Sequence, residues 1–166
     1  MQPISNINLL ASNLLQEFLA AQEDVAPTSL PSVNQHQWRP PEQDHFKVNF
    51  DAALFQSLNL AGIGVVIRNW RGGVVAALSM PTTLASSVAD LEALACRRAL
   101  LFAAEKELQK VIFEGDSVSV MTAIAQENPI LTSYGDIVDD IRYVASAFQS
   151  AQFVFVHGLV MWLPMR

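Results

Sequence analysis

The segment HFKVNFDAALF, residues 45–55, alternates apolar and polar side chains. One side of an extended chain carries Phe46, Val48 and Phe50. The other side carries Lys47, Asn49 and Asp51. This alternation predicts a strand with one buried face over about residues 46–53. Aspartate is depleted in strands because its short charged side chain packs poorly on a pleated surface. A carboxylate at this place therefore requires an explanation.

The composition is typical of a folded domain and argues against strong nucleic-acid binding. Of the 166 residues, 51% are hydrophobic and 16% are charged, which is enough apolar material for a core. The formal net charge is −6 and the isoelectric point is about 4.9. Strong non-specific binders neutralise phosphates with Lys and Arg, so we expect any binding to nucleic acid to be weak.

Targeting signals and cysteine usage favour an intracellular protein of the cytoplasm or nucleus. The N-terminus has no basic start followed by an apolar core and a cleavage site, so we expect no secretion. The longest apolar run, residues 60–67, is too short to span a bilayer, so we expect no membrane partner. The single cysteine, Cys96, excludes an intrachain disulfide and fits a reducing compartment.

The chain divides into three regions by composition. Residues 1–24 carry apolar side chains at helical spacing and predict an amphipathic helix. Residues 25–45 contain four prolines and several Ser, Asn and Gln residues, which predicts a linker. Residues 46–166 are expected to form the folded domain, with Trp38 packing the linker onto it.

The order of periodic segments in this domain predicts an α/β fold. Strands are expected over about residues 46–53, 61–68, 73–80, 111–114 and 153–157, and helices over about residues 87–108, 117–127 and 132–149. The first three strands follow one another closely and predict antiparallel neighbours, with a tight turn at residues 69–72. Helical crossovers before the fourth and fifth strands predict that these run parallel to the first. The expected fold is a five-stranded mixed sheet flanked by helices.

Polar residues at the helix starts predict the N-caps, because a cap side chain accepts a hydrogen bond from a backbone N–H group that has no partner in the helix. Ser86 or Ser87 is expected to cap the first helix of the domain. Asp116 is expected to cap the second, and Thr132 or Ser133 the third.

Three carboxylates are expected to meet at one edge of the sheet. Asp51 lies towards the end of the first strand and Asp116 just past the end of the fourth, and the carboxyl ends of parallel strands share an edge. Glu92 shares a helix face with the small residues Ala95 and Ala99, which let the helix approach the sheet closely. Clustered carboxylates resist ionisation unless a cation is present, and such oxygen ligands suit Mg²⁺ or Mn²⁺.

Each of these acids also has an ordinary interpretation. Asp51 can be a polar residue at a strand end, Glu92 a solvated helix residue and Asp116 a helix cap. The spacing alone leaves these alternatives open beside the metal site.

Five motifs follow one another in an order that resembles a known family. They are WRPP (38–41), KVNFDAA (47–53), AGIGVVIRNWRGGVVAA (61–77), LEALACRRAL (91–100) and VIFEGDSVSV (111–120). Together they resemble the successive blocks of the ribonuclease H family, in the version found in many plant proteins and in plant non-LTR retrotransposon polyproteins. The resemblance covers about residues 38–157.

The resemblance implies an RNase H-like fold and cleavage of the RNA strand of RNA–DNA hybrids, with two Mg²⁺ ions held by four acids. It assigns the first three acids to Asp51, Glu92 and Asp116, as catalytic residues and metal ligands. It also implies that Gly62 and Gly64 allow close backbone approach beside the site.

The fourth acid of the family has no counterpart in this sequence. In the family it comes from a final helix after the fifth strand, whereas here His157 is followed by GLVMWLPMR and no Asp or Glu occurs after Asp140. We therefore expect a truncated or altered C-terminus without the final helix, and an impaired activity.

Two rival hypotheses follow from this departure. One is a catalytically inactive domain retained as a nucleic-acid or protein interaction module. The other is a retrotransposon remnant without a selected function.

Overall fold

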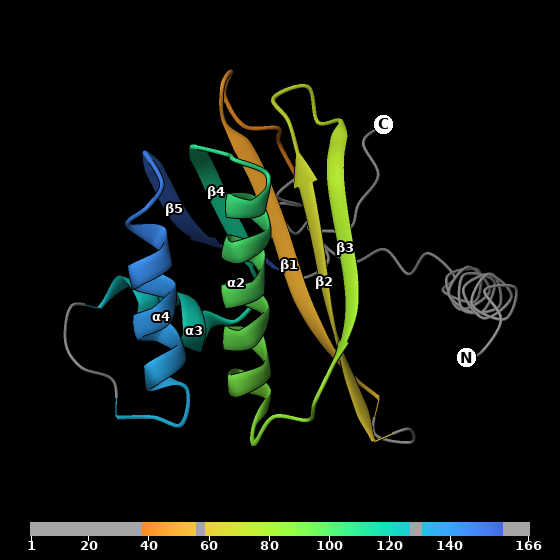
Figure 1. Cartoon of the computed structure of the whole chain (residues 1–166), viewed down its shortest axis with the longest axis vertical. Coiled ribbons are helices and arrows are strands. Elements are labelled where there is room, and N and C mark those ends of the chain that lie inside the picture. The colour runs from red at the N-terminus through yellow and green to blue at the C-terminus, as the bar shows by residue number, and fades with distance from the viewer. Residues whose placement is uncertain (1–37, 56–58, 127–130, 158–166) are drawn as a thin grey trace, which may run out of the picture. The chain divides into compact units, whose positions relative to one another are not determined.

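A computed structural model describes residues 38–55, 59–126 and 131–157 (Figure 1). The helix expected over residues 1–24 lies outside the described residues, as do most of the expected linker and the tail after residue 157. No helix among the described residues is long and apolar enough to cross a bilayer.

The described residues form strands and helices in the predicted order. The elements are β1 (Phe46–Phe55), β2 (Leu60–Arg68), β3 (Val74–Thr82), α2 (Val88–Glu105), β4 (Lys110–Gly115), α3 (Val118–Ala125), α4 (Gly135–Ala145) and β5 (Ser150–Phe155). The last strand begins at residue 150 rather than 153, and α4 is shorter than expected at both ends. The turn between β2 and β3 is closed by a hydrogen bond from Gly72 N to Asn69 O, as predicted.

The strands form one sheet in the order β3-β2-β1-β4-β5 (Figure 1). β1 is antiparallel to β2, and β2 is antiparallel to β3. β1 is parallel to β4, and β4 is parallel to β5. The predicted mixed sheet is confirmed, and β1 lies at its centre.

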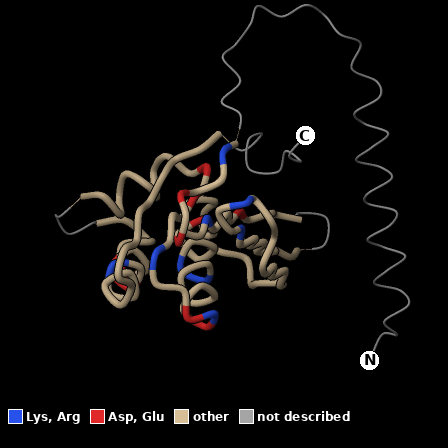
Figure 2. Tube along the Cα trace, turned by 90° about the horizontal axis from the view of Figure 1, so that it is seen from above, with Lys and Arg blue, Asp and Glu red and all other residues tan. Residues whose placement is uncertain are grey.

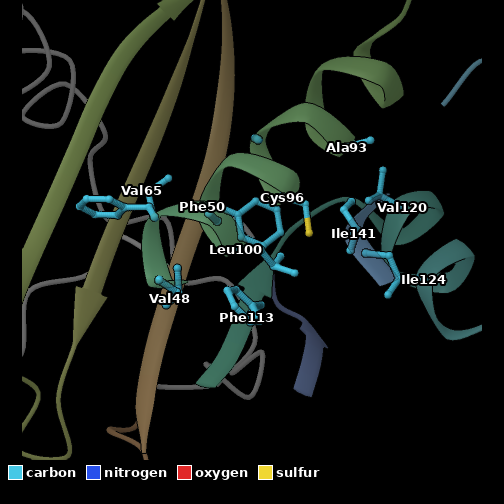
Figure 3. Packing of buried hydrophobic residues seen from close by; sticks show 14 of the residues in the cluster. Val48, Phe50, Val65, Ala93, Cys96, Leu100, Phe113, Val120, Ile124 and Ile141 are labelled. Carbon is cyan, nitrogen blue, oxygen red and sulfur yellow. The ribbon is translucent and has the colours of Figure 1, made fainter. Parts of the chain in front are cut away.

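The apolar face of β1 is the middle of the core. Val48 and Phe50 are fully buried there, and Cys96 and Leu100 of α2 lie against them (Figure 3). Small side chains on α2, among them the buried Ala99, keep this helix close to β1. The helix therefore carries its other residues to the edge of the sheet.

One predicted cap is confirmed and two are wrong. Ser87 caps α2 and accepts a hydrogen bond from Asp90 N at 3.0 Å. Ser117, rather than Asp116, is the N-cap of α3.

Neither Thr132 nor Ser133 caps α4, because Tyr134 occupies the cap position without a side-chain bond. Ser133 instead donates its hydroxyl to the Asp90 carboxylate. This buried carboxylate of α2 needs a donor, and it takes the hydroxyl that the sequence pattern assigned to the helix start.

Gly115 is expected to be intolerant of a side chain. A Cβ atom there would lie 2.5 Å from Phe50 Cζ and 2.7 Å from Met121 Cε, and both side chains are held in the core. We predict that Gly115→Ala lowers the free energy of unfolding by about 1–3 kcal/mol, measured by urea denaturation.

Gly73→Ala is the matched control, because its Cβ would meet only the Asn69 side chain at 3.4 Å or more. Its effect should stay within about 0.5 kcal/mol. Equal losses for both variants would contradict this account of Gly115.

Candidate metal centre

Acidic side chains from three elements converge at one edge of the sheet. Asp51 comes from β1, Glu92 from the start of the second turn of α2, and Asp116 from the residue directly after β4. One carboxylate oxygen of each lies within 4.8 Å of the others. The three acids singled out in the sequence are thus brought together.

The register of the sheet explains how Asp51 and Asp116 meet. The β1–β4 pairing ends at Asn49 opposite Glu114. Two residues further on, β1 carries Asp51 with Gly64 of β2 on one side and no β4 residue on the other. Because the two strands are parallel, the chain leaves β4 at the same edge and places Asp116 there.

The close packing of α2 explains the position of Glu92. Ala95 and Ala99 on the same face are fully buried, and Glu92 itself is only 7% exposed. A helix acid that pointed to solvent would be far more accessible, so the ordinary interpretation of Glu92 as a solvated residue is wrong.

The Glu92 carboxyl group is in an electrostatically unfavourable place. Burial raises its pKa to about 8, and the negative charges of Asp51 and Asp116 add to this effect. Its Oε2 atom is buried and accepts no hydrogen bond within the part of the chain that the structure describes. Buried polar atoms are nearly always partnered, so this oxygen calls for either a proton or a cation.

The donor set fits a hard divalent cation. The converging ligand atoms are all carboxylate oxygens, which suit Mg²⁺ or Mn²⁺. A bound ion would supply a partner for Glu92 Oε2, which has none among the residues described, and would offset the repulsion between the acids. Cys96, one turn along α2 from Glu92, does not belong to this set, because burial raises the pKa of its thiol and keeps it protonated.

The Asp51 carboxylate also accepts a hydrogen bond from the backbone of the next residue. Ala52 N donates to Asp51 Oδ1 at 2.8 Å, and this contact orients the carboxylate at the strand edge. Asp51 and Asp116 are both half-buried, so the cluster is open to solvent on one side. An ion or a substrate group can therefore reach it.

A shallow hollow of about 230 Å³ begins at Asp51 and runs over β1, β2 and β3. Gly62 and Gly64 form part of its lining, together with Ala53 and Ser79. Because glycine has no side chain, the backbone is accessible here, which fits the close approach expected at these glycines. A larger hollow of about 420 Å³, lined by residues such as Leu60 and Leu84, contains none of the three acids.

Sequence reasoning missed a second buried carboxylate beside the cluster. Glu114 of β4 is 3% exposed, and its Oε2 accepts hydrogen bonds from Trp38 Nε1 at 3.0 Å and Asn49 Nδ2 at 2.7 Å. Lys47 Nζ forms an ion pair with its Oε1 at 2.6 Å. The available signal was an acid inside a predicted buried strand, opposite a strand that offers Lys and Asn on its polar face.

Comparison with known proteins gives a family and a fold. The sequence model of the Reverse transcriptase-like family matches residues 49–158. No curated protein matches this sequence significantly. Several solved structures are similar in fold.

The RNase H1 of Halobacterium salinarum superposes with a TM-score of 0.63 at 21% identity, covering 69% of this chain and 87% of that chain. The N-terminal RNase H domain of a Mycobacterium tuberculosis protein has a TM-score of 0.63 at 16% identity, with 70% and 85% covered. LC11-RNase H1, isolated from compost and solved in complex with an RNA/DNA hybrid, has a TM-score of 0.61 at 18% identity, with 70% and 88% covered.

The raised pKa of Glu92 predicts a pH-dependent stability in the presence of EDTA. Between pH 4.5 and about 8 the native state retains the Glu92 proton that the unfolded chain releases. The native state binds more protons in this window, so the free energy of unfolding falls as pH rises. We predict that Glu92→Gln lacks this fall and exceeds the wild type by at least about 1 kcal/mol at pH 8, measured by urea denaturation.

Glu105→Gln serves as the control on the same helix, because Glu105 is exposed and paired with Arg98. Its stability should follow the wild-type pH dependence. A constant difference between wild type and Glu92→Gln across this pH range would contradict the assignment of the shift to Glu92.

Proposed function

The chain belongs to the Reverse transcriptase-like family, and from this premise we propose that it hydrolyses the RNA strand of RNA–DNA hybrids with the help of a divalent metal ion. The observation that carries the proposal is the convergence of Asp51, Glu92 and Asp116. In addition, the buried Oε2 of Glu92 has no hydrogen-bond partner among the described residues. The RNase H-like fold supports it.

The three acids would act together as the metal ligands. Mg²⁺ or Mn²⁺ held by these acids would supply activation of a water for attack on a phosphodiester and stabilisation of the leaving oxygen. Glu92 has to lose its proton before it becomes a ligand, so ion binding and ionisation of Glu92 are coupled. Asp51 and Asp116 hold their carboxylates on the solvent-accessible side, where a scissile phosphate can approach.

The substrate would be recognised mainly by shape and by 2′-hydroxyl contacts. The half-buried Gly62 and Gly64, which line the hollow, suit such contacts, because RNA differs from DNA at that hydroxyl. Four basic side chains form ion pairs with acids, which reduces their availability to phosphates; they are Lys47, Arg97, Arg98 and Arg142. Figure 2 shows the Lys and Arg positions scattered over the domain rather than gathered in one stripe. We therefore propose weak binding to the hybrid.

The finer identity is also a proposal. The order of the motif blocks supports a domain of plant non-LTR retrotransposon type, and the use of a single cysteine supports action in the reducing cytoplasm or nucleus. A second candidate function is an inactive nucleic-acid or protein interaction module. It is favoured by one observation, namely that the described residues bring together three acids where the family resemblance implies four.

Cleavage of a labelled RNA–DNA hybrid tests the proposed activity. With Mg²⁺ or Mn²⁺, the wild-type chain should shorten the RNA strand, and Asp116→Asn should slow this by about 100-fold or more because it removes a ligand charge. Asp136→Asn, at an exposed site in the first turn of α4, should retain the wild-type rate. Binding without cleavage by both wild type and Asp116→Asn would favour the interaction module.

Metal binding is tested separately from activity by thermal unfolding. Mn²⁺ at about 100 times its Kd should stabilise the wild-type chain by about 2.7 kcal/mol, because the ion binds only the folded state. Asp51→Asn and Glu92→Gln should each lose most of this stabilisation, whereas Asp136→Asn should keep it. An equal response of all four proteins would show that the ion does not bind at the cluster.

A further inference from the structure

Glu114 is the centre of a buried polar network on the face of β1 and β4 opposite Val48. Trp38 Nε1 and Asn49 Nδ2 donate hydrogen bonds to its Oε2 at 3.0 and 2.7 Å. Lys47 Nζ forms an ion pair with its Oε1 at 2.6 Å. Both carboxylate oxygens are therefore used, and the charge is balanced by an ammonium group. A buried carboxylate held in this way has one defined position.

Asn49 is fixed by the same network. Its Nδ2 donates to Glu114, and its Oδ1 accepts from Arg68 Nη1 at 2.7 Å. The side chain is fully buried, although alternation placed it on the polar face of the strand. Lys47 Nζ and Arg68 Cζ each lie over the Trp38 ring, 5.3 Å from its centroid. The indole is 9% exposed and thus belongs to the folded domain.

The network lies directly before the metal centre on both strands. Asn49 and Glu114 are the final partners of the β1–β4 ladder. Asp51 follows Asn49 by two residues and Asp116 follows Glu114 by two residues. The side-chain bond between Asn49 and Glu114 therefore closes the ladder at the point where the strands separate to present the two acids.

The opposite face of the same point is held by steric packing. Gly115 leaves no room for a Cβ atom beneath Phe50 and Met121. The end of the β1–β4 pairing is thus fixed on one face of the sheet by packing around Gly115, and on the other face by the Glu114 network. The packing uses Met121 of α3, whereas the network uses Trp38 from the segment before β1.

We propose that Trp38 and Glu114 are positioning residues of the metal centre, which rests on the proposed function of that centre. The indole N–H holds the Glu114 carboxylate, Glu114 holds Asn49, and this bonded pair sets the spacing of Asp51 and Asp116. The segment before β1 thereby contributes to the affinity of the cluster for its ion, although none of its described residues contributes a ligand to the cluster.

The test compares Mn²⁺ affinity, measured by electron paramagnetic resonance, in the full chain and in Trp38→Phe. Phenylalanine retains an aromatic ring near Lys47 and Arg68 but cannot donate a hydrogen bond to Glu114. The Kd for Mn²⁺ should rise by about tenfold, which is the effect typical of losing a residue that orients metal ligands. Each protein is measured well below its own Tm, with circular dichroism to confirm folding.

Trp70→Phe is the matched control, since Trp70 is an exposed residue of the β2–β3 turn whose ring contacts Arg71. Its Kd should stay within about twofold of the wild type. Glu114→Gln provides a second perturbation of the same network and should also raise the Kd by about tenfold. If Trp38→Phe does not fold, the Kd of Glu114→Gln tests whether the network positions the metal ligands.

The double variant Trp38→Phe/Glu114→Gln shows whether Trp38 acts through Glu114. Its Kd should be no higher than that of the weaker-binding single variant, because both changes break one chain of contacts. If the increase in Kd of the double variant equals the product of the two single increases, Trp38 does not act through Glu114.

Two further outcomes separate this inference from the proposed function. If Trp38→Phe lowers Tm but leaves the Mn²⁺ Kd unchanged, the positioning role is wrong and the metal-dependent function stands. If the wild-type chain binds no Mn²⁺, the proposed function fails, and the positioning role fails with it.

Discussion

The parallel pairing of β1 with β4 is the constraint on which the rest of the domain depends. Parallel neighbours require a crossover, and α2 is the element that makes it between β3 and β4. The pairing lasts for only four residues of each strand, from Phe46 to Asn49 on β1. Where it stops, both strands open at the same edge, and the two acids that follow, Asp51 and Asp116, lie close together there.

Two glutamates near this edge are treated in opposite ways. Glu114 has three donors around its carboxylate, one of which is an ammonium group. Glu92 has an oxygen with no donor in the described chain and two acidic neighbours, so its charged form is unfavourable. A satisfied buried carboxylate stabilises a single structure, whereas an unsatisfied one favours a ligand. This contrast separates the structural acid from the candidate ligand without reference to any relative.

Much of the fold and part of the candidate site could be predicted, because their signals are local. Alternation located β1, the turn residues located the β2–β3 connection, and the pair Ser86–Ser87 marked the start of α2, where the structure selects Ser87 as the cap. The acids Asp51 and Asp116 were expected at one edge because parallel strands end together. The hydrogen-bond partners were not predictable in this way. Ser133 bonds to Asp90, 43 residues away, and Trp38 bonds to Glu114, 76 residues away.

The sequence by itself determined the order of the strands and helices and the three acids that the fold brings together, because periodicity and chain order act over short distances. The tertiary structure alone decided that Asn49 is buried, that Glu114 is fully paired and that Glu92 Oε2 has no partner within the described ranges. These outcomes depend on which groups meet after the sheet and α2 have packed. A buried carboxylate has the same letter in a sequence whether its charge is balanced or not, and only its neighbours in space distinguish the two cases.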